Sequence, residues 1–128
     1  MKFTIYTEPI PKARARTVVR NGRVMSFTPK ATAEAEATIR AQIADSKTFY
    51  QKDTPLMLSV TFYVSRPPSV PKKRILPITR PDIDNYIKTV MDAINGYLMA
   101  DDSQVCLLVA GKKYGAPPRI EFEIEALE

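Results

Sequence analysis

The segment from Leu56 to Val64 constrains the fold of this chain more than any other. Its side chains alternate in two sets, Leu56, Leu58, Val60, Phe62 and Val64 against Met57, Ser59, Thr61 and Tyr63. Strict alternation predicts a strand, and because both sets contain apolar side chains, the strand is expected to be central and covered on both faces. A chain of 128 residues with 45% hydrophobic content can build one domain around it. We therefore predict a single domain over residues 1–128.

Further strands are predicted on either side of this segment. Alternation of apolar and polar residues marks residues 2–7 and 119–127, and residues 105–110 are a short apolar run that is also expected to be a strand. Asn21-Gly22 supplies the positive φ angles of a two-residue turn and predicts a hairpin of strands 17–20 and 23–27. In the last strand the glutamates at 121, 123 and 125 alternate with apolar residues, and they are expected to form a solvated face rather than a site.

Two helices are predicted from their end signals. The first follows a Thr28 cap and Pro29 and runs to about residue 45, with its apolar stripe at Ala31, Ala35, Ile39 and Ile43. The second begins at residue 84 or 85 and stops at Asn95-Gly96, with its apolar stripe at Ile87, Val90, Met91 and Ile94. Residues 66–79 are rich in proline without an apolar period, which predicts a long, functional loop.

Composition indicates the cellular compartment in which this chain is expected to function. A single cysteine, Cys106, cannot form an internal disulfide, and its apolar neighbours predict a buried, inert thiol. The chain contains no apolar run of membrane-spanning length and no signal-like N-terminal block. We therefore expect a soluble protein of the reducing cytoplasm, with no membrane partner.

The charges are unevenly distributed around a net charge of +5. Residues 12–30 and 66–80 are basic and contain no acid, whereas all five acids between residues 82 and 102 are aspartates. Positive loops beside an acidic cluster are typical of a metal-dependent enzyme that acts on a phosphodiester, although either basic segment alone could be a solvated surface. The candidate DNA contacts are Lys12, Arg14, Arg16, Arg20, Arg23, Lys72, Lys73, Arg74 and Arg80.

Asp82 and Asp84 are the first candidate metal ligands. In an extended segment they would point the same way, with Cα atoms about 6.6 Å apart, whereas in a helix they would diverge by about 200°. Pro81 favours the extended conformation at the start of this run. Lys88 follows Asp84 by four residues, which places it one helical turn away.

Asp101 and Asp102 are the second acidic element. Carboxylate oxygens suit Mg²⁺, for which Mn²⁺ could substitute. Two simpler interpretations stay open: Asp84 as a helix cap, and Asp101-Asp102-Ser103 as a turn before a strand.

Several other types of catalytic or binding site are excluded because the sequence lacks the residues or motifs they need. The chain has no histidine, so a Ser/His/Asp triad and a histidine-ligated zinc site are ruled out. Neither a GxGxxG nor a GxxxxGK[ST] pattern occurs. An EF-hand beginning at Asp82 fails because Ile87 stands where the turn glycine belongs.

Together these residues resemble the signature of the RusA-type Holliday junction resolvases, small metal-dependent endonucleases of bacteria and their phages. The matching motifs are Arg80-Pro81-Asp82-Ile83-Asp84-Asn85, then Lys88 and Asp92-Ala93, then Leu98-Met99-Ala100-Asp101-Asp102-Ser103-Gln104-Val105. A looser second element is Pro9 to Arg16, in which Ala15 departs from the proline of many relatives.

The resemblance implies a fold and an activity. The fold would be α+β, a mixed sheet of about four to five strands with two flanking helices, in a homodimer. Asp82, Asp84 and Asp102 would be the catalytic and metal-binding aspartates, Lys88 the catalytic lysine and Asp101 a helper. The implied substrate is a four-way DNA junction, nicked symmetrically on two opposed strands in recombination and repair. The alternatives are a non-catalytic binder of branched DNA and a nuclease for flaps, RNA or plain duplex.

Overall fold

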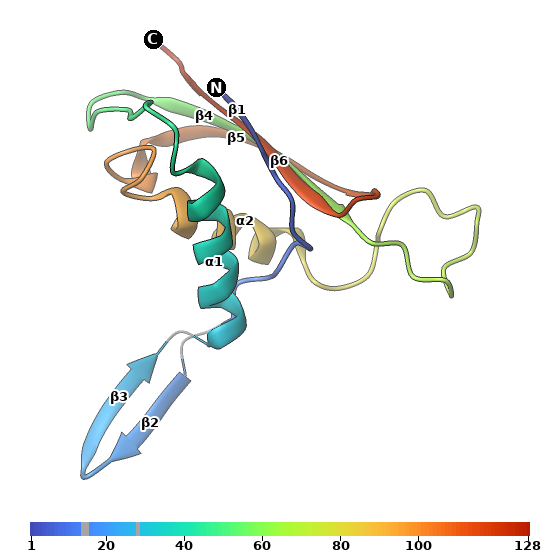
Figure 1. The fold of residues 1–128 in the computed structure, drawn as a ribbon, viewed down its shortest axis with the longest axis horizontal. Coiled ribbons are helices and arrows are strands. Elements are labelled where there is room, and N and C mark those ends of the chain that lie inside the picture. Colours follow the sequence, from blue (N-terminus) through green and yellow to red (C-terminus); the bar gives the residue numbers. More distant parts are fainter. Residues whose placement is uncertain (14–15, 28) are drawn as a thin grey trace.

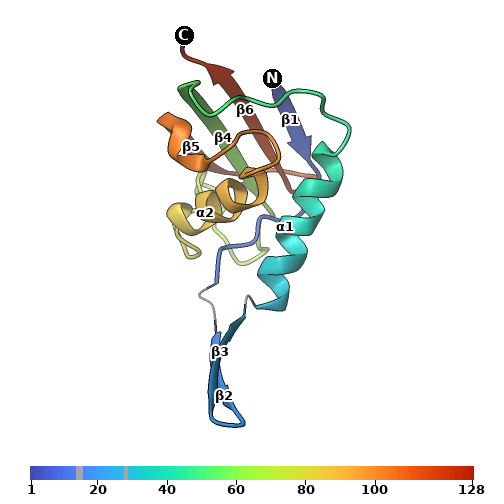
Figure 2. The same cartoon turned by 90° about the vertical axis from the view of Figure 1, so that its left-hand side faces the viewer.

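The computed structural model describes residues 1–13, 16–27 and 29–128, and shows a four-stranded sheet with two helices on one face (Figures 1 and 2). The sheet has the order β1-β6-β4-β5. Its strands are β1 (Lys2–Ile5), β4 (Leu56–Val64), β5 (Val105–Tyr114) and β6 (Arg119–Ala126). The helices are α1 (Lys30–Ile43) and α2 (Ile83–Ile94), and a short 3₁₀ helix, η1 (Asp102–Gln104), precedes β5. The α+β prediction with a mixed sheet is confirmed.

β4 is the central strand, as its alternation predicts. It pairs antiparallel with β6 and parallel with β5, so that Leu58 lies between Ile124 and Leu108. β5 therefore forms one edge of the sheet and β1 the other. An extra residue in β5, Cys106, makes a bulge between the pairs formed by Val105 and Leu107.

The hydrophobic core lies between the sheet and the helices. The inward residues of β4 from Leu56 to Phe62 are almost completely buried, and they pack with residues of β6, α1 and α2. Burial of this alternating face is what fixes the register of the sheet, since a shift by one residue would turn every inward side chain outward.

α1 follows Pro29 and buries Thr32, Ala35, Glu36, Ile39 and Ile43. Ala31 is exposed, so the predicted stripe is wrong at its first position. In the first turn Thr32 is buried instead of Ala31, and its hydroxyl accepts a hydrogen bond from the backbone N–H of Ala13, at 3.1 Å. The predicted Thr28 cap lies outside the described residues.

α2 packs on both the sheet and α1, so its buried face is wide. This face comprises Tyr86, Thr89, Val90, Ala93 and Ile94. The predicted stripe is therefore only partly right, because Ile87 and Met91 are half-buried beside it. The predicted stop is confirmed: Asn95 is the C-cap and Gly96 has a φ of 80°.

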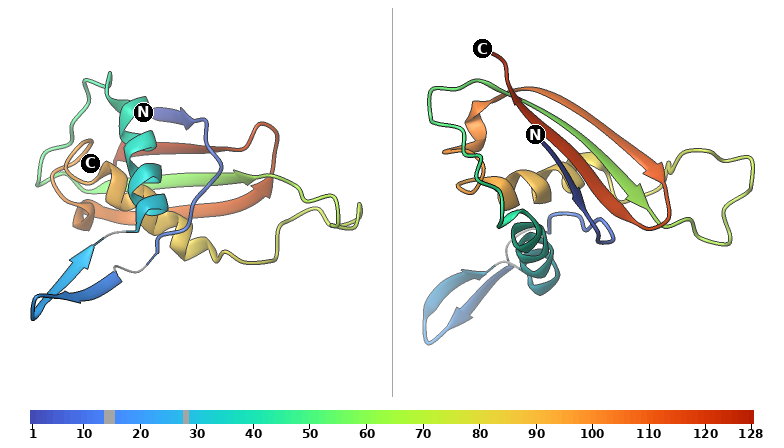
Figure 3. Two further views of the ribbon diagram at one scale, coloured as in Figure 1. Left: turned by 60° about the horizontal axis from the view of Figure 1, so that its bottom comes forward. Right: turned by 45° about the horizontal axis from the view of Figure 1, so that its top comes forward.

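Two segments project from this body at different ends (Figures 1 and 3). The first is the hairpin of β2 (Arg16–Arg20) and β3 (Arg23–Phe27). Its turn residues Asn21 and Gly22 have φ angles of 51° and 74°, as predicted for this pair.

The second projecting segment is the loop between β4 and α2, which is free of helix and strand as predicted. Arg66 holds it together, donating hydrogen bonds to the carbonyls of Pro71 (2.6 Å) and Arg74 (2.7 Å). Lys112 of β5 donates to the carbonyls of Thr79 and Pro81, both at 3.1 Å. These bonds give the loop a fixed path into α2.

Cys106 is exposed, so the prediction of a buried thiol is wrong. The reason is the position of β5 at the edge of the sheet, which a run of apolar residues alone does not reveal. Within the described residues, α1 and α2 contain 14 and 12 residues, and neither is long and apolar enough to cross a bilayer.

Candidate functional site

Asp82 and Asp84 lie at the N-terminal end of α2, and both are exposed. Asp82 is the N-cap, with φ −71° and ψ 146°, and its side chain makes no capping hydrogen bond. Asp84 is in the first helical turn, so the extended conformation predicted for this run is correct for Asp82 and wrong for Asp84. Ile83, the first residue of the helix, packs against the core.

The carboxylates of Asp82 and Asp84 form no ion pair with any residue that the structure describes. The partial positive charge at the start of a helix offsets part of their charge. The oxygens of both are thus accessible to a cation from solvent.

Lys88 lies one turn further along α2 than Asp84, as the spacing predicts. Its ammonium pairs with Asp92 Oδ1 at 3.2 Å, one turn further on, and the side chain stays largely exposed. Lys88 therefore extends from the surface of α2 with a carboxylate partner on the side away from Asp82.

A second charge cluster, which the sequence does not predict, joins Lys12, Glu36 and Asp92. Lys12 Nζ lies 2.7 Å from Glu36 Oε1 and 3.1 Å from Asp92 Oδ2, with side-chain exposures of 23%, 12% and 23%. The backbone N–H of Lys12 also donates to the carbonyl of Asn85, at 2.8 Å. The segment before the hairpin is thereby attached to both helices.

The pKa of Lys12 is raised from its ordinary value of 10.5. Burial acts in the opposite direction and is the largest single influence, but hydrogen bonds to Glu36 and Asp92 and the charges of both outweigh it together. The ammonium of Lys12, predicted as a DNA contact, is thus engaged within the protein.

Arg40 of α1 fixes the C-terminal end of α2. Its Nε donates to the carbonyl of Ala93 at 3.0 Å and its Nη2 to that of Asp92 at 3.1 Å, and its guanidinium lies 4.7 Å from the centroid of the Tyr97 ring. A cation at this position satisfies terminal carbonyls and complements the helix dipole.

Asp101 caps the 3₁₀ helix η1. Its Oδ2 accepts from the backbone N–H of Ser103 at 3.1 Å, and its own N–H donates to Gln104 Oε1 at 2.9 Å. The hydrogen bonds from Ser103, and to a smaller extent from Asn95 and the backbone of Asp102, hold the pKa of Asp101 below its usual 3.8. For Asp101 the turn interpretation is therefore correct.

Asp102 lies in the first turn of η1 and is half-buried. It is at the opposite end of α2 from Asp82, because Asp101 contacts Asn95, the C-cap of that helix. Twelve residues of helix span about 18 Å. Figures 1 and 3 show the same arrangement, with η1 beyond the last turn of α2.

β5 gives an independent measure of this separation. Lys112, near the end of β5, contacts the carbonyl of Pro81, whereas Asp102 precedes the start of the strand at Val105. The seven steps from Val105 to Lys112 correspond to about 23 Å. One chain therefore does not bring Asp102 to Asp82 and Asp84.

A divalent cation held by three carboxylates does not fit a single copy of this chain. Over residues 1–13, 16–27 and 29–128, no group of three His, Cys, Asp or Glu side chains is arranged to hold a metal ion. Of the three aspartates predicted to bind the metal, Asp82 and Asp84 lie together at the N-terminal end of α2, and Asp102 does not.

Apart from Lys12, the predicted DNA contacts that the structure describes lie on the two projecting segments. Arg20 and Arg23 face each other at the tip of the hairpin, and both are exposed. Lys72, Lys73 and Arg80 are exposed on the loop, where Arg74 is half-buried. Arg14 and the side chain of Arg16 lie outside the described residues.

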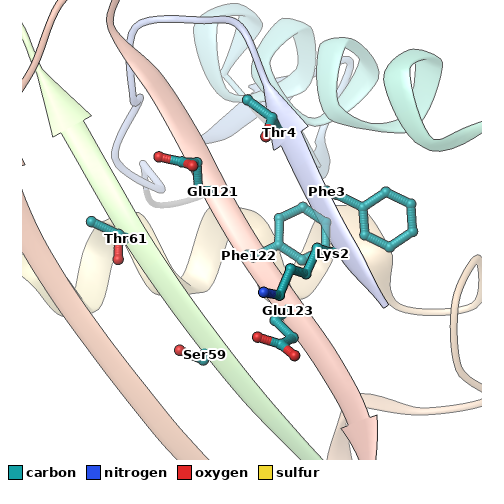
Figure 4. A pocket seen from close by; sticks show the side chains of 8 residues that line it. All are labelled: Lys2, Phe3, Thr4, Ser59, Thr61, Glu121, Phe122 and Glu123. Atoms are coloured by element: carbon teal, nitrogen blue, oxygen red, sulfur yellow. The ribbon is translucent and has the colours of Figure 1, made fainter.

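The outer face of the sheet, away from the helices, carries a shallow pocket (Figure 4). Its lining includes Ser59, Thr61, Glu121 and Glu123, which stand on β4 and β6. Ile120, Phe122 and Ile124 are buried beneath, so the outward orientation predicted for the glutamates is confirmed. The hydrogen bond and the charge of Glu123 raise the pKa of Glu125 on this face. The pocket lies on the opposite side of the sheet from the aspartates of α2.

Comparison with known proteins agrees with the sequence resemblance. The family described as endodeoxyribonuclease RusA matches residues 7–125. The uncharacterized protein YqaN of Bacillus subtilis (strain 168) is 32% identical over 134 residues, covering 97% of this chain and 94% of YqaN. The crossover junction endodeoxyribonuclease rusA of Lactococcus phage r1t is 36% identical over 92 residues, covering 68% of each protein.

Proposed function

Because this chain belongs to the RusA endodeoxyribonuclease family, we propose that it resolves Holliday junctions by paired, symmetric nicks, as a homodimer that requires a divalent cation. The proposed role is the processing of branched DNA in recombination and repair.

The observation that carries this proposal is the placement of Asp82 and Asp84. Both carboxylates are exposed, they are unpaired among the described residues, and they directly follow the basic loop. Lys112 fixes the last part of that loop through the carbonyls of Thr79 and Pro81. A DNA backbone lying on the loop would therefore be guided to the start of α2.

The proposed cation is Mg²⁺, with Mn²⁺ as a substitute, because hard divalent ions prefer carboxylate oxygens. Such an ion would supply activation of water and neutralisation of charge at the scissile phosphate. Asp82 and Asp84 would supply oxygens that hold the ion, and the described residues of one chain do not bring a third carboxylate to them.

Lys88 is proposed to neutralise charge that develops on the phosphate during cleavage. Its ion pair with Asp92 restricts the position of the ammonium on α2. Because the side chain of Lys88 is largely exposed, its ammonium can reach a phosphate oxygen of DNA bound at the surface.

The hairpin and the loop are proposed to bind the DNA backbone. The two segments project from different ends of the body, which suits a branched substrate whose arms diverge (Figure 3). Binding through such contacts is expected to weaken steeply with salt.

The homodimer is proposed from the edge strand β5. Its residues Leu107, Leu108 and Val109 are 49%, 43% and 56% exposed, a row of apolar side chains on an edge that could pair with another strand. A two-fold dimer would present two identical sites to a two-fold substrate.

The decisive experiment is cleavage of a synthetic four-way junction, with flap, RNA and linear duplex controls. Symmetric nicks that depend on Mg²⁺ and appear only on the junction would support the proposal. Tight binding without nicks at any pH would contradict it and indicate a non-catalytic binder. Preferred cutting of a flap, RNA or duplex would indicate a nuclease of different specificity.

A further inference from the structure

We infer that Asp92 is a positioning residue for Lys88, and that it holds the ammonium of Lys88 away from the carboxylate of Asp84. This inference rests on the proposed function, because it concerns how Lys88 and Asp84 are kept apart in that same site. It assigns a role to Asp92, a residue for which no contact with DNA or with the cation is proposed.

Lys88 has two carboxylates within reach on its own helix. Asp84 lies one turn before it on α2, and Asp92 lies one turn after it. Helical side chains lean toward the N-terminus, and an acid on the N-terminal side of a lysine makes the better pair in an isolated helix. Both effects favour Asp84 as the partner of Lys88.

The structure shows the other pair. Lys88 Nζ lies 3.2 Å from Asp92 Oδ1, whereas no ion pair between Lys88 and Asp84 occurs in the part of the chain that the structure describes. The position of Lys88 is therefore set by the surroundings of Asp92 and not by the helix alone.

A second cation holds the carboxylate of Asp92 by its other oxygen. Lys12 Nζ lies 3.1 Å from Asp92 Oδ2, which leaves Oδ1 for Lys88. Glu36 Oε1 lies 2.7 Å from the same ammonium and offsets the charge of Lys12. The negative charge of Asp92 thus remains available to attract Lys88.

The main chain at Asp92 is fixed as well. Arg40 of α1 donates to the carbonyls of Asp92 and Ala93, at 3.1 and 3.0 Å, where α1 packs against α2 (Figure 2). The side chain of Asp92 is 23% exposed, against 58% for Lys88. A fixed carboxylate that is partly shielded from water attracts the mobile ammonium more strongly than a fully solvated one.

Loss of the charge at position 92 would leave Asp84 as the carboxylate one turn from Lys88. The ammonium would then turn toward the start of α2 and pair with Asp84. This pair would neutralise a carboxylate that the proposed function requires, and it would also engage the lysine. Asp92 would therefore influence the site from about two turns away along the helix.

Crystal structures of the wild type and of Asp92→Asn test the position of Lys88 directly. The ammonium is expected beside Asp92 in the wild type, and within about 4 Å of an Asp84 oxygen in the variant. A lysine that stays clear of Asp84 in the variant would overturn the inference. Because this readout does not depend on cleavage, a wild type that nicks no junction would refute the proposed function alone.

Single-turnover nicking of a four-way junction gives the second readout. Asp92→Asn is expected to slow nicking about two- to five-fold, as expected for one exposed ion pair. Junction affinity should stay unchanged or rise, because a negative charge is removed. In a Lys88→Met background the same substitution is expected to have no further effect. Equal slowing in both backgrounds would overturn the inference, since Asp92 would then act independently of Lys88.

Ile39→Val is the control for lost stability. Ile39 is buried in α1, and its shortening destabilises the core without changing any charge. At a temperature where both variants are folded, Ile39→Val is expected to nick at the wild-type rate. Equal slowing by Ile39→Val and Asp92→Asn would attribute the effect to stability and overturn the inference.

Discussion

At the residue scale, the ion pairs of Lys12 and Asp92 show what spacing can and cannot reveal. The separation of Lys88 from Asp84 and from Asp92 by one turn follows from the sequence, because helical neighbours are local. The contact of Lys12 with Glu36 and Asp92 depends on how α1 and α2 pack, so no local pattern predicts it.

Asp92→Asn is expected to lower the free energy of unfolding by about 1–3 kcal/mol, because it removes the charge that faces the largely buried ammonium of Lys12. Urea denaturation measures the change. Glu34→Gln is the control, since its pair with Lys30 is exposed and is expected to contribute less than about 1 kcal/mol. Equal effects of the two substitutions would show that Asp92 does not stabilise the fold through Lys12.

Stability is expected to fall in alkaline solution through Lys12. Its pKa is raised in the folded protein, so its contribution is complete below 10.5 and is lost as pH rises through the folded value. Tyr86 acts in the same direction, because burial raises its pKa above 10.0. Urea midpoints of the wild type and Lys12→Met, compared between about pH 9 and pH 11, are expected to converge as pH rises. A constant difference would contradict this origin.

Asp82→Asn and Asp84→Asn are each expected to reduce junction nicking at least about 100-fold, since loss of cation binding is a loss of several kcal/mol. Junction binding should persist or tighten, because a negative charge near phosphate is removed. Asp45→Asn, an exposed acid beyond the end of α1, is the control. Near-normal nicking by both variants would refute the assignment.

At the element scale, features that depend on a few neighbouring residues are predicted correctly, and features that depend on tertiary packing are not. The boundaries of β4 and the Asn21-Gly22 turn are as predicted, because alternation and turn chemistry act over a few residues. The buried face of α2 and the exposure of Cys106 differ from the predictions, because both depend on which elements pack beside them. The separation of Asp102 from Asp84 is likewise a property of tertiary structure.

The β4–α2 loop is expected to contribute phosphate contacts. Lys72→Ala with Lys73→Ala should weaken junction binding and reduce the slope of log affinity against log salt by about 1.8, as expected for two lost contacts. Titrations at several salt concentrations measure it. The exposed pair Lys47 and Lys52, changed to Ala together, is the control. An unchanged slope in the loop variant would remove the loop from the DNA interface.

At the scale of the whole molecule, the proposed assembly depends on the apolar edge of β5. Leu108→Lys is expected to convert the dimer to a monomer, because it places a charge from each subunit in an apolar interface. Sedimentation or light scattering measures the mass. Leu127→Lys, at a similarly exposed apolar position near the C-terminus, should leave the mass unchanged. A dimer that survives Leu108→Lys would place the interface elsewhere.

The hairpin that stands away from the sheet has a consequence for the dynamics of the protein. Its strands pair with each other, and a lone two-stranded ribbon is only marginally stable in water. Its backbone amides are therefore expected to exchange with deuterium through local opening, much faster than those of β4 and at rates that barely change with denaturant. Slower exchange confined to this ribbon on addition of a junction would identify it as a segment that becomes ordered on the nucleic acid.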